Sequence, residues 1–151
     1  IKDKINFNLL LVGRGVEKEN LIKYIYENNL SKQVKLMDFQ NNPFNLIKSS
    51  DVFILTSLYE GLPNVLLESQ VLKKFIISSD CPTGPREILL NGKAGFLFNV
   101  GDHTELSNLI LNYYKNKKLL SKKISIGYKN LSRFDYNRNL KKYLNIIKDC
   151  I

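Results

Sequence analysis

The chain alternates short apolar runs with stretches whose apolar residues recur at helical spacing. The apolar runs predict buried strands, because strands covered on both faces are continuously hydrophobic. These strands are expected at residues 7–12, 34–37, 52–55, 75–78 and 95–98. Helices are expected at residues 17–29, 44–49, 64–72, 86–90, 103–114, 117–126 and 137–150. Alternation of this kind, without a hairpin signature, predicts one α/β domain over residues 1–151, with a Rossmann-like parallel sheet and helices on both faces.

Four loops rich in Gly and Pro each follow a predicted strand. They cover residues 13–15, 38–43, 59–63 and 80–85. In an open parallel sheet, ligands bind in the crevice at the carboxyl ends of the strands. We therefore expect the four loops to converge on a single site.

The third of these loops lies in the stretch from Ser57 to Ser69, around which the other predicted elements are arranged. Pro63 fits the first turn of the following helix, where a missing N–H does no harm. The free N–H groups of that helix end attract anions, above all phosphate. Glu60 precedes the turn and Glu68 lies inside the helix. Two carboxylates around such an end suggest a ligand with hydroxyls on either side of its phosphates, although exposed glutamates are common on any helix.

Composition narrows the class of protein without choosing a ligand. Hydrophobic residues make up 44% and charged residues 25% of the chain, as in ordinary globular proteins. The net charge of +9 suits phosphorylated ligands, nucleic acid or an anionic membrane surface. Cys81 and Cys150 are far apart and form no ligand or redox pattern, which favours reduced thiols in the cytoplasm. No apolar run approaches the roughly 18 residues of a membrane span.

Several other residues have an ordinary structural explanation. Gly13-Arg14-Gly15 lacks the third glycine of a dinucleotide fingerprint, and Arg14 could meet a phosphate or be solvated. His103 is expected in the first turn of a surface helix. Phe39 and Phe44 are expected in the core, although an aromatic near the site could flank a base. No Ser/His/Asp set, metal cluster or Walker loop supports a hydrolase or an ATPase.

Residues 60–68 read E-G-L-P-N-V-L-L-E. This pattern resembles the signature of retaining glycosyltransferases of the two-domain GT-B architecture, in the large family 4. The resemblance extends over residues 9–15, 34–44, 50–57, 79–89, 91–98 and 101–102. It covers about residues 7–110 and is similar to members that build bacterial surface polysaccharides and lipid-linked sugars. The chain is thereby identified as the C-terminal, donor-binding domain of such an enzyme.

The resemblance implies different roles for the two carboxylates. Glu68 would accept hydrogen bonds from both ribose hydroxyls of a nucleotide-sugar donor. Glu60, the catalytic residue, would contact the donor sugar and stabilise the positive charge that develops at its anomeric carbon. Transfer with retention is commonly described as front-face displacement, in which the leaving diphosphate takes the acceptor's proton. Glu60 is therefore not expected to be a nucleophile.

The resemblance also assigns the remaining donor contacts. Backbone N–H groups of residues 61–65 would hold the sugar and the diphosphate, and Gly61 would let the main chain approach the sugar closely. Residues 36–39 would line the base pocket, and residues 13–15 would open the nucleotide site. The implied contacts are Gly13, Arg14, Gly15, Leu36, Met37, Phe39, Gly61, Leu62, Pro63, Asn64 and Val65. No metal or other cofactor is expected.

The expected donor is a nucleotide diphosphate sugar, with UDP favoured as carrier and a hexose or N-acetylhexosamine as cargo. The expected acceptor is a growing glycan or a lipid-linked saccharide, and nucleic acid is not an expected partner. The enzyme is expected in the cytoplasm, with possible peripheral contact at the inner face of the cytoplasmic membrane.

The family's N-terminal acceptor domain and its first strand–helix unit are not found in these 151 residues. We therefore expect the chain alone to bind nucleotide weakly and to transfer no sugar. Two alternatives are a sugar-nucleotide epimerase or phosphorylase on the same fold, and a non-catalytic nucleotide-binding module.

Overall fold

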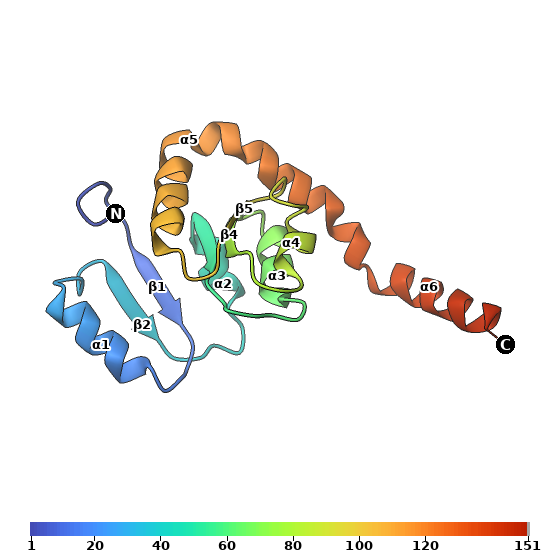
Figure 1. Ribbon diagram of the computed structural model, residues 1–151, viewed down its shortest axis with the longest axis horizontal. Coiled ribbons are helices and arrows are strands. Elements are labelled where there is room, and N and C mark those ends of the chain that lie inside the picture. The colour runs from blue at the N-terminus through green and yellow to red at the C-terminus, as the bar shows by residue number, and fades with distance from the viewer. Residues whose placement is uncertain (151) are drawn as a thin grey trace. The chain divides into compact units, whose positions relative to one another are not determined.

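The computed structural model describes residues 1–150 and divides into two compact units, Ile1–Pro43 and the chain from Phe44 onward. The first unit contains β1 (Leu9–Val12), α1 (Lys18–Glu27) and β2 (Val34–Met37) (Figure 1). β1 and β2 pair in parallel along their whole length. Among the hydrophobic residues of this unit, only Val34 is buried.

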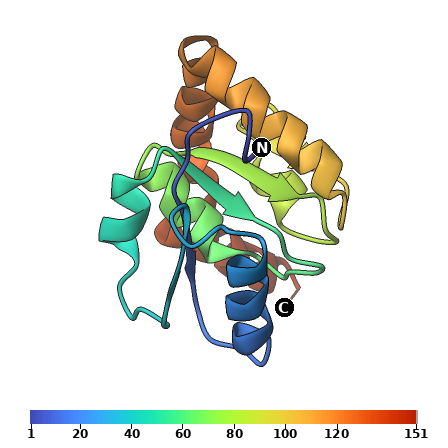
Figure 2. The same cartoon turned by 90° about the vertical axis from the view of Figure 1, so that its left-hand side faces the viewer.

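The second unit holds a three-stranded sheet in the order β3-β4-β5, with all strands parallel (Figures 1 and 2). Its elements are α2 (Phe44–Ser49), β3 (Val52–Leu55), α3 (Asn64–Val71), β4 (Phe75–Ser79), α4 (Pro85–Ile88), β5 (Phe96–Phe98), α5 (His103–Asn130), a 3₁₀ turn (Leu131–Phe134) and α6 (Tyr136–Asp149). Parallel pairing and the alternation of strands and helices are confirmed.

β4 is the central strand and the axis of the core, and all five of its residues are buried. Since successive side chains of a strand point to opposite faces, Ile76 and Ile77 belong to different hydrophobic clusters. Ile76 packs with Leu66 of α3 and with Ile88 and Leu89 at α4. Phe75 and Ile77 pack with Phe98 of β5 and Tyr113 of α5. Helices therefore cover both faces of this sheet, as predicted.

The sheet arrangement differs from the expectation of one continuous sheet. The strands form two sheets, one of β1 and β2 and one of β3, β4 and β5. Alternating strands and helices dictate that neighbouring strands run parallel, but they do not dictate that every strand joins the same ladder. The parallel class was therefore predictable, whereas the division into two sheets was not.

The two helices expected at residues 103–114 and 117–126 are one bent helix, α5 (Figure 1). Asn116 leaves helical geometry, with φ −122° and ψ 23°. Its amide donates to the Asn112 carbonyl at 3.1 Å and to the Asn112 side chain at 2.7 Å. A side chain that competes for the helix's own acceptors is a common cause of a kink. Asp102 caps α5 as predicted, accepting from the Glu105 N–H at 2.7 Å.

Two further expectations are wrong in detail. Pro63 lies at the N-cap of α3 with extended backbone, one residue before the first helical position. Phe39 and Phe44 do not belong to the core, because their side chains are 56% and 44% exposed. Phe39 lies in the loop after β2, and Phe44 is the first residue of α2, where it lines a groove beside α3. None of the helices among residues 1–150 is long and apolar enough to span a membrane.

Candidate functional site

The turn between β3 and α3 holds the first candidate carboxylate in a defined position. Glu60 is half-buried, and its Oε1 accepts a hydrogen bond of 2.7 Å from the Ser57 hydroxyl. Within residues 1–150, the second carboxylate oxygen of Glu60 takes part in no hydrogen bond or ion pair. One oxygen is therefore anchored by the protein, and the other is available to a ligand.

The N-terminus of α3 offers a group of unused backbone donors next to Glu60. No side chain caps this helix, and Pro63 has no N–H to offer. Within the described residues, the N–H groups of Gly61, Leu62, Asn64 and Val65 donate to no protein acceptor. Unpaired N–H groups at a helix start carry partial positive charge and bind anions.

Gly61 stands in open space within this turn. A Cβ atom built on it would meet no other atom within 4 Å, and its φ lies outside the left-handed region. Neither packing nor backbone strain in this chain therefore requires a glycine here. A requirement for glycine would come from something that approaches the turn from outside.

Glu68 lies one turn into α3, about 6 Å along the helix from Asn64. It borders a groove of about 410 Å³ whose other lining residues are mostly apolar. The groove is lined by Phe44, Asn64, Leu67, Glu68, Val71 and Leu72. The Glu68 carboxylate makes no hydrogen bond or ion pair to another described residue, and its main-chain carbonyl accepts from the Leu72 N–H at 3.0 Å. A carboxylate at the edge of an apolar groove can accept hydrogen bonds from a ligand that has both an apolar and a polar part.

Sequence reasoning missed the residues that hold the turn from the neighbouring strand. Ser79 of β4 is fully buried, and its hydroxyl donates to the Ser57 carbonyl at 2.7 Å. The Thr83 hydroxyl, in the loop after β4, donates to the Glu60 carbonyl. The two residues of each contact are more than 20 positions apart in the sequence (22 for Ser79–Ser57 and 23 for Thr83–Glu60), so no local spacing could have revealed these contacts.

An ion pair organises the same loop after β4. Arg86 of α4 donates through Nε to Asp80 Oδ1 at 3.0 Å, and its Nη2 contacts the other carboxylate oxygen. The hydrogen bond to Asp80 raises the pKa of Arg86 above its ordinary value. Because the guanidinium binds the Asp80 carboxylate in a bidentate manner, Arg86 stabilises the conformation of the loop.

The first unit brings together two of the predicted loops. The Arg14 guanidinium lies over the Phe39 ring, 5.3 Å from its centroid. Lys18 contacts Asp38 at 2.6 Å, and this hydrogen bond raises the lysine's pKa. Gly15 is exposed, Leu36 is half-buried and Met37 is 37% exposed. Residues 13–15 and 38–39 thus meet at the carboxyl edge of β1 and β2; convergence of all four loops stays a prediction.

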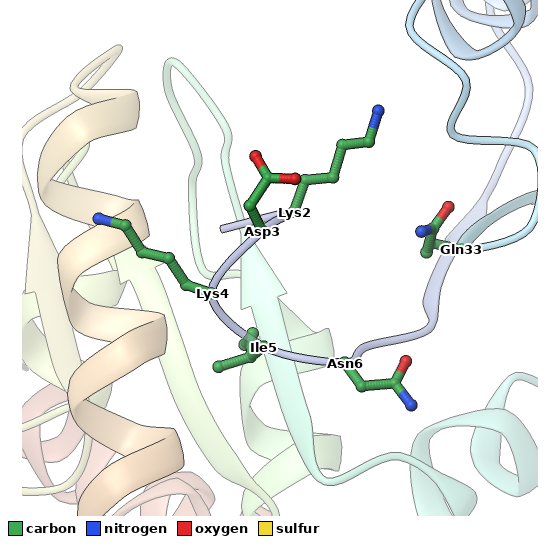
Figure 3. A pocket seen from close by; sticks show the side chains of 6 residues that line it. All are labelled: Lys2, Asp3, Lys4, Ile5, Asn6 and Gln33. Atoms are coloured by element: carbon green, nitrogen blue, oxygen red, sulfur yellow. The ribbon is translucent and has the colours of Figure 1, made fainter.

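The remaining candidate residues from the sequence are not arranged as a catalytic or metal-binding site. His103 is exposed at the first position of α5, as expected. Among the described residues, no three His, Cys, Asp or Glu side chains are grouped to hold a metal ion, and Cys81 and Cys150 are unpaired. A hollow near the N-terminus is lined by Lys2, Asp3, Lys4, Ile5, Asn6 and Gln33. Figure 3 shows that its lysine and aspartate side chains fan outward rather than converge.

Comparison with known proteins decides the family. The profile described as "Glycosyl transferases group 1" matches residues 1–130. The chain belongs to the group 1 glycosyltransferases. It is 33% identical over 146 residues to the UDP-Gal:alpha-D-GlcNAc-diphosphoundecaprenol alpha-1,3-galactosyltransferase of Escherichia coli, covering 91% of this chain and 37% of that protein. It is 45% identical over 84 residues to an uncharacterised glycosyltransferase of Methanocaldococcus jannaschii, covering 56% and 21%.

The fold is also that of the C-terminal half of GT-B glycosyltransferases. HepE of Anabaena, solved in complex with UDP, superimposes with a TM-score of 0.85 at 22% identity, over 95% of this chain and 41% of that one. The chain therefore spans between about a fifth and two fifths of the length of these group 1 relatives.

Proposed function

We propose that this chain is the donor-binding part of a retaining glycosyltransferase that uses a nucleotide diphosphate sugar. The observation that supports it most is the turn at residues 60–65, where an anchored carboxylate adjoins four unused backbone N–H groups. The N–H groups would bind the diphosphate. The available oxygen of Glu60 would bind the donor sugar.

Glu68 and its groove suit the nucleoside part of the donor. An ionised carboxylate accepts from two neighbouring ribose hydroxyls at once, and Glu68 has no protein partner that would compete. The apolar wall at Leu67 and Val71 would exclude water from the sugar–base portion. Leu36, Met37 and Phe39 are proposed to contact the base, on the strength of the family resemblance.

Glu60 would act electrostatically as the bond to the leaving diphosphate breaks. Positive charge develops at the anomeric carbon, and a carboxylate fixed in advance by Ser57 stabilises it without reorganising. The helix end at Asn64 would stabilise the negative charge that accumulates on the diphosphate. The developing positive charge would then lie beside the Glu60 carboxylate, and the developing negative charge would lie beside the positive end of α3. With both charges stabilised in this way, the reaction would need no bound metal.

The named relatives favour a UDP-linked donor and a lipid-linked or polymeric glycan acceptor. The E. coli relative is named for UDP-galactose and a diphosphoundecaprenol acceptor, and HepE was solved with UDP. We propose a hexose or N-acetylhexosamine as cargo, for surface polysaccharide or glycolipid synthesis. With a net charge of +9, the domain would be attracted to an anionic membrane surface, and liposome binding that falls with added salt would support this.

The test is calorimetric titration of UDP, GDP, ADP and CMP into the intact protein and its Glu68→Ala variant. We expect UDP to bind most tightly and Glu68→Ala to weaken UDP at least about tenfold, since two charge-assisted hydrogen bonds are lost. Glu19→Ala, on the exposed first turn of α1, is the matched control and should bind normally. If no nucleotide is preferred by either protein, the donor-binding proposal is wrong.

A further inference from the structure

The last residue of β4 and the loop that follows β4 hold the Glu60 turn at two points. Ser79, which is fully buried, fixes the Ser57 carbonyl at 2.7 Å. The Thr83 hydroxyl contacts the Glu60 carbonyl oxygen, and the Pro82 carbonyl oxygen lies 2.8 Å from the same hydroxyl. Ser57 in turn donates to the Glu60 carboxylate at 2.7 Å, so both the main chain and the side chain of Glu60 are held.

The same segment also closes on the end of the turn. Gly84 has φ +83°, and a Cβ atom there would lie 2.5 Å from the Gly61 carbonyl oxygen and would overlap Pro63 Cδ. No side chain fits between the two loops. The backbone of Gly84 therefore lies directly against the Gly61 carbonyl and the Pro63 ring.

Thr83 adopts a conformation that its own side chain disfavours. Its φ is +60°, in the left-handed region that β-branched residues rarely enter. Glycine or asparagine would occupy that conformation more easily. Local backbone preference thus gives no reason for a threonine here, and the hydroxyl contact to Glu60 does.

The geometry points to Thr83 as a positioning residue for the Glu60–Gly61 peptide, an inference that rests on the proposed function. A peptide unit is planar, and its C=O and N–H point in opposite directions. By holding the Glu60 carbonyl oxygen, the Thr83 hydroxyl fixes the direction in which the Gly61 N–H points. That N–H is the first of the four unused donors at the start of α3. Thr83 would act on the nucleotide sugar through the orientation of this peptide.

The experiment compares Thr83→Val, which keeps the branched shape without the hydroxyl, with Thr83→Ser, which keeps the hydroxyl. Thr104→Val, on the exposed first turn of α5, is the matched control. All are made in the intact protein and assayed with UDP-sugars, with the amide resonances of Gly61 recorded by NMR in the absence of nucleotide. We expect Thr83→Val to lower kcat about tenfold with little change in KM and to shift the Gly61 resonance. Thr83→Ser and Thr104→Val should retain wild-type kcat and resonance.

Two results would overturn the inference. One is a Thr83→Val protein with wild-type kcat and an unmoved Gly61 resonance. The other is equal loss in Thr83→Ser and Thr83→Val accompanied by a lower unfolding temperature, which would show a structural role only. If the wild type transfers no sugar from any donor, the proposed function fails, while the Gly61 resonance still decides whether Thr83 orients the peptide.

Discussion

The Ser57 hydroxyl donates to Glu60 Oε1 at 2.7 Å across the tip of the turn between β3 and α3. This bond fixes one oxygen of the carboxylate, and the other oxygen has no hydrogen-bond or ion-pair partner among the described residues. Because the acceptor is ionised, the bond is worth about 1.5–3 kcal/mol, more than a bond between neutral groups. Ser57→Ala should therefore lower kcat about tenfold. Ser121→Ala, whose hydroxyl bonds within α5 at 2.6 Å to Lys118, should not change the rate.

Glu60→Gln should reduce kcat by about 100-fold or more while UDP affinity stays within about twofold. The amide keeps the shape but loses the charge that would stabilise the transition state, and interactions made only there appear in kcat. Steady-state kinetics together with UDP titration measures both quantities. Loss of UDP binding with unchanged kcat would instead place Glu60 among the ground-state contacts.

Gly61→Ala and Gly84→Ala form a contrasting pair. At Gly61 a methyl group meets no protein atom within 4 Å, so the free energy of unfolding should change by less than about 0.5 kcal/mol. Binding of the UDP-sugar should nevertheless fall, because the methyl group would occupy the ligand's space. At Gly84 it would overlap Pro63 and force a side chain into positive φ, at a cost of at least about 2 kcal/mol. Urea denaturation with UDP-sugar titration separates the two effects; equal destabilisation would contradict the prediction.

Tyr113 predicts a stability change at alkaline pH. Burial raises the pKa of its phenol above the ordinary 10.0, so folding favours the neutral form. The contribution of the neutral phenol to the free energy of unfolding is complete below pH 10. It is lost as the pH rises through the raised pKa of Tyr113 in the folded state. Tyr113→Phe should cost about 1 kcal/mol at pH 7, through loss of the 3.2 Å hydrogen bond to the Asp51 carbonyl. The difference from wild type should shrink above pH 10 in urea denaturation, whereas Tyr114→Phe, at a 53% exposed position, should show no such trend.

Asp102 and Asp135 cap two helices in the same way, each accepting from an N–H three residues on at 2.7 Å. Asp102→Ala should lower the free energy of unfolding by about 1 kcal/mol, because α5 packs on the core through Tyr113. α6 has no buried residue, so Asp135→Ala should fray that helix without moving the main transition. Hydrogen exchange with chemical denaturation distinguishes these outcomes. An equal loss of global stability in both variants would show that α6 unfolds together with the sheet.

The strand and helix positions were largely predictable, because each depends on a pattern only a few residues long. The apolar run at β3, the break at Gly61 and Pro63, and the resumed helical spacing identify the strand, turn and helix. The same stretch places Glu60 and Glu68 on either side of the helix start. The sequence could not foresee that Phe39 is exposed, since an aromatic beside a strand is equally consistent with a core position.

By itself the sequence determined the parallel α/β class, the order of the elements and the family motif around Glu60. Only the tertiary structure decided that the strands form two sheets and that α5 is one bent helix. It also decided that Ser79 and Thr83 hold the turn that carries Glu60. The physical reason is the separation along the sequence of the residues involved. Hydrophobic periodicity and turn preferences depend on residues that are only a few positions apart. Contacts across more than 20 residues exist only once β3 and β4 have paired and brought their carboxyl ends together.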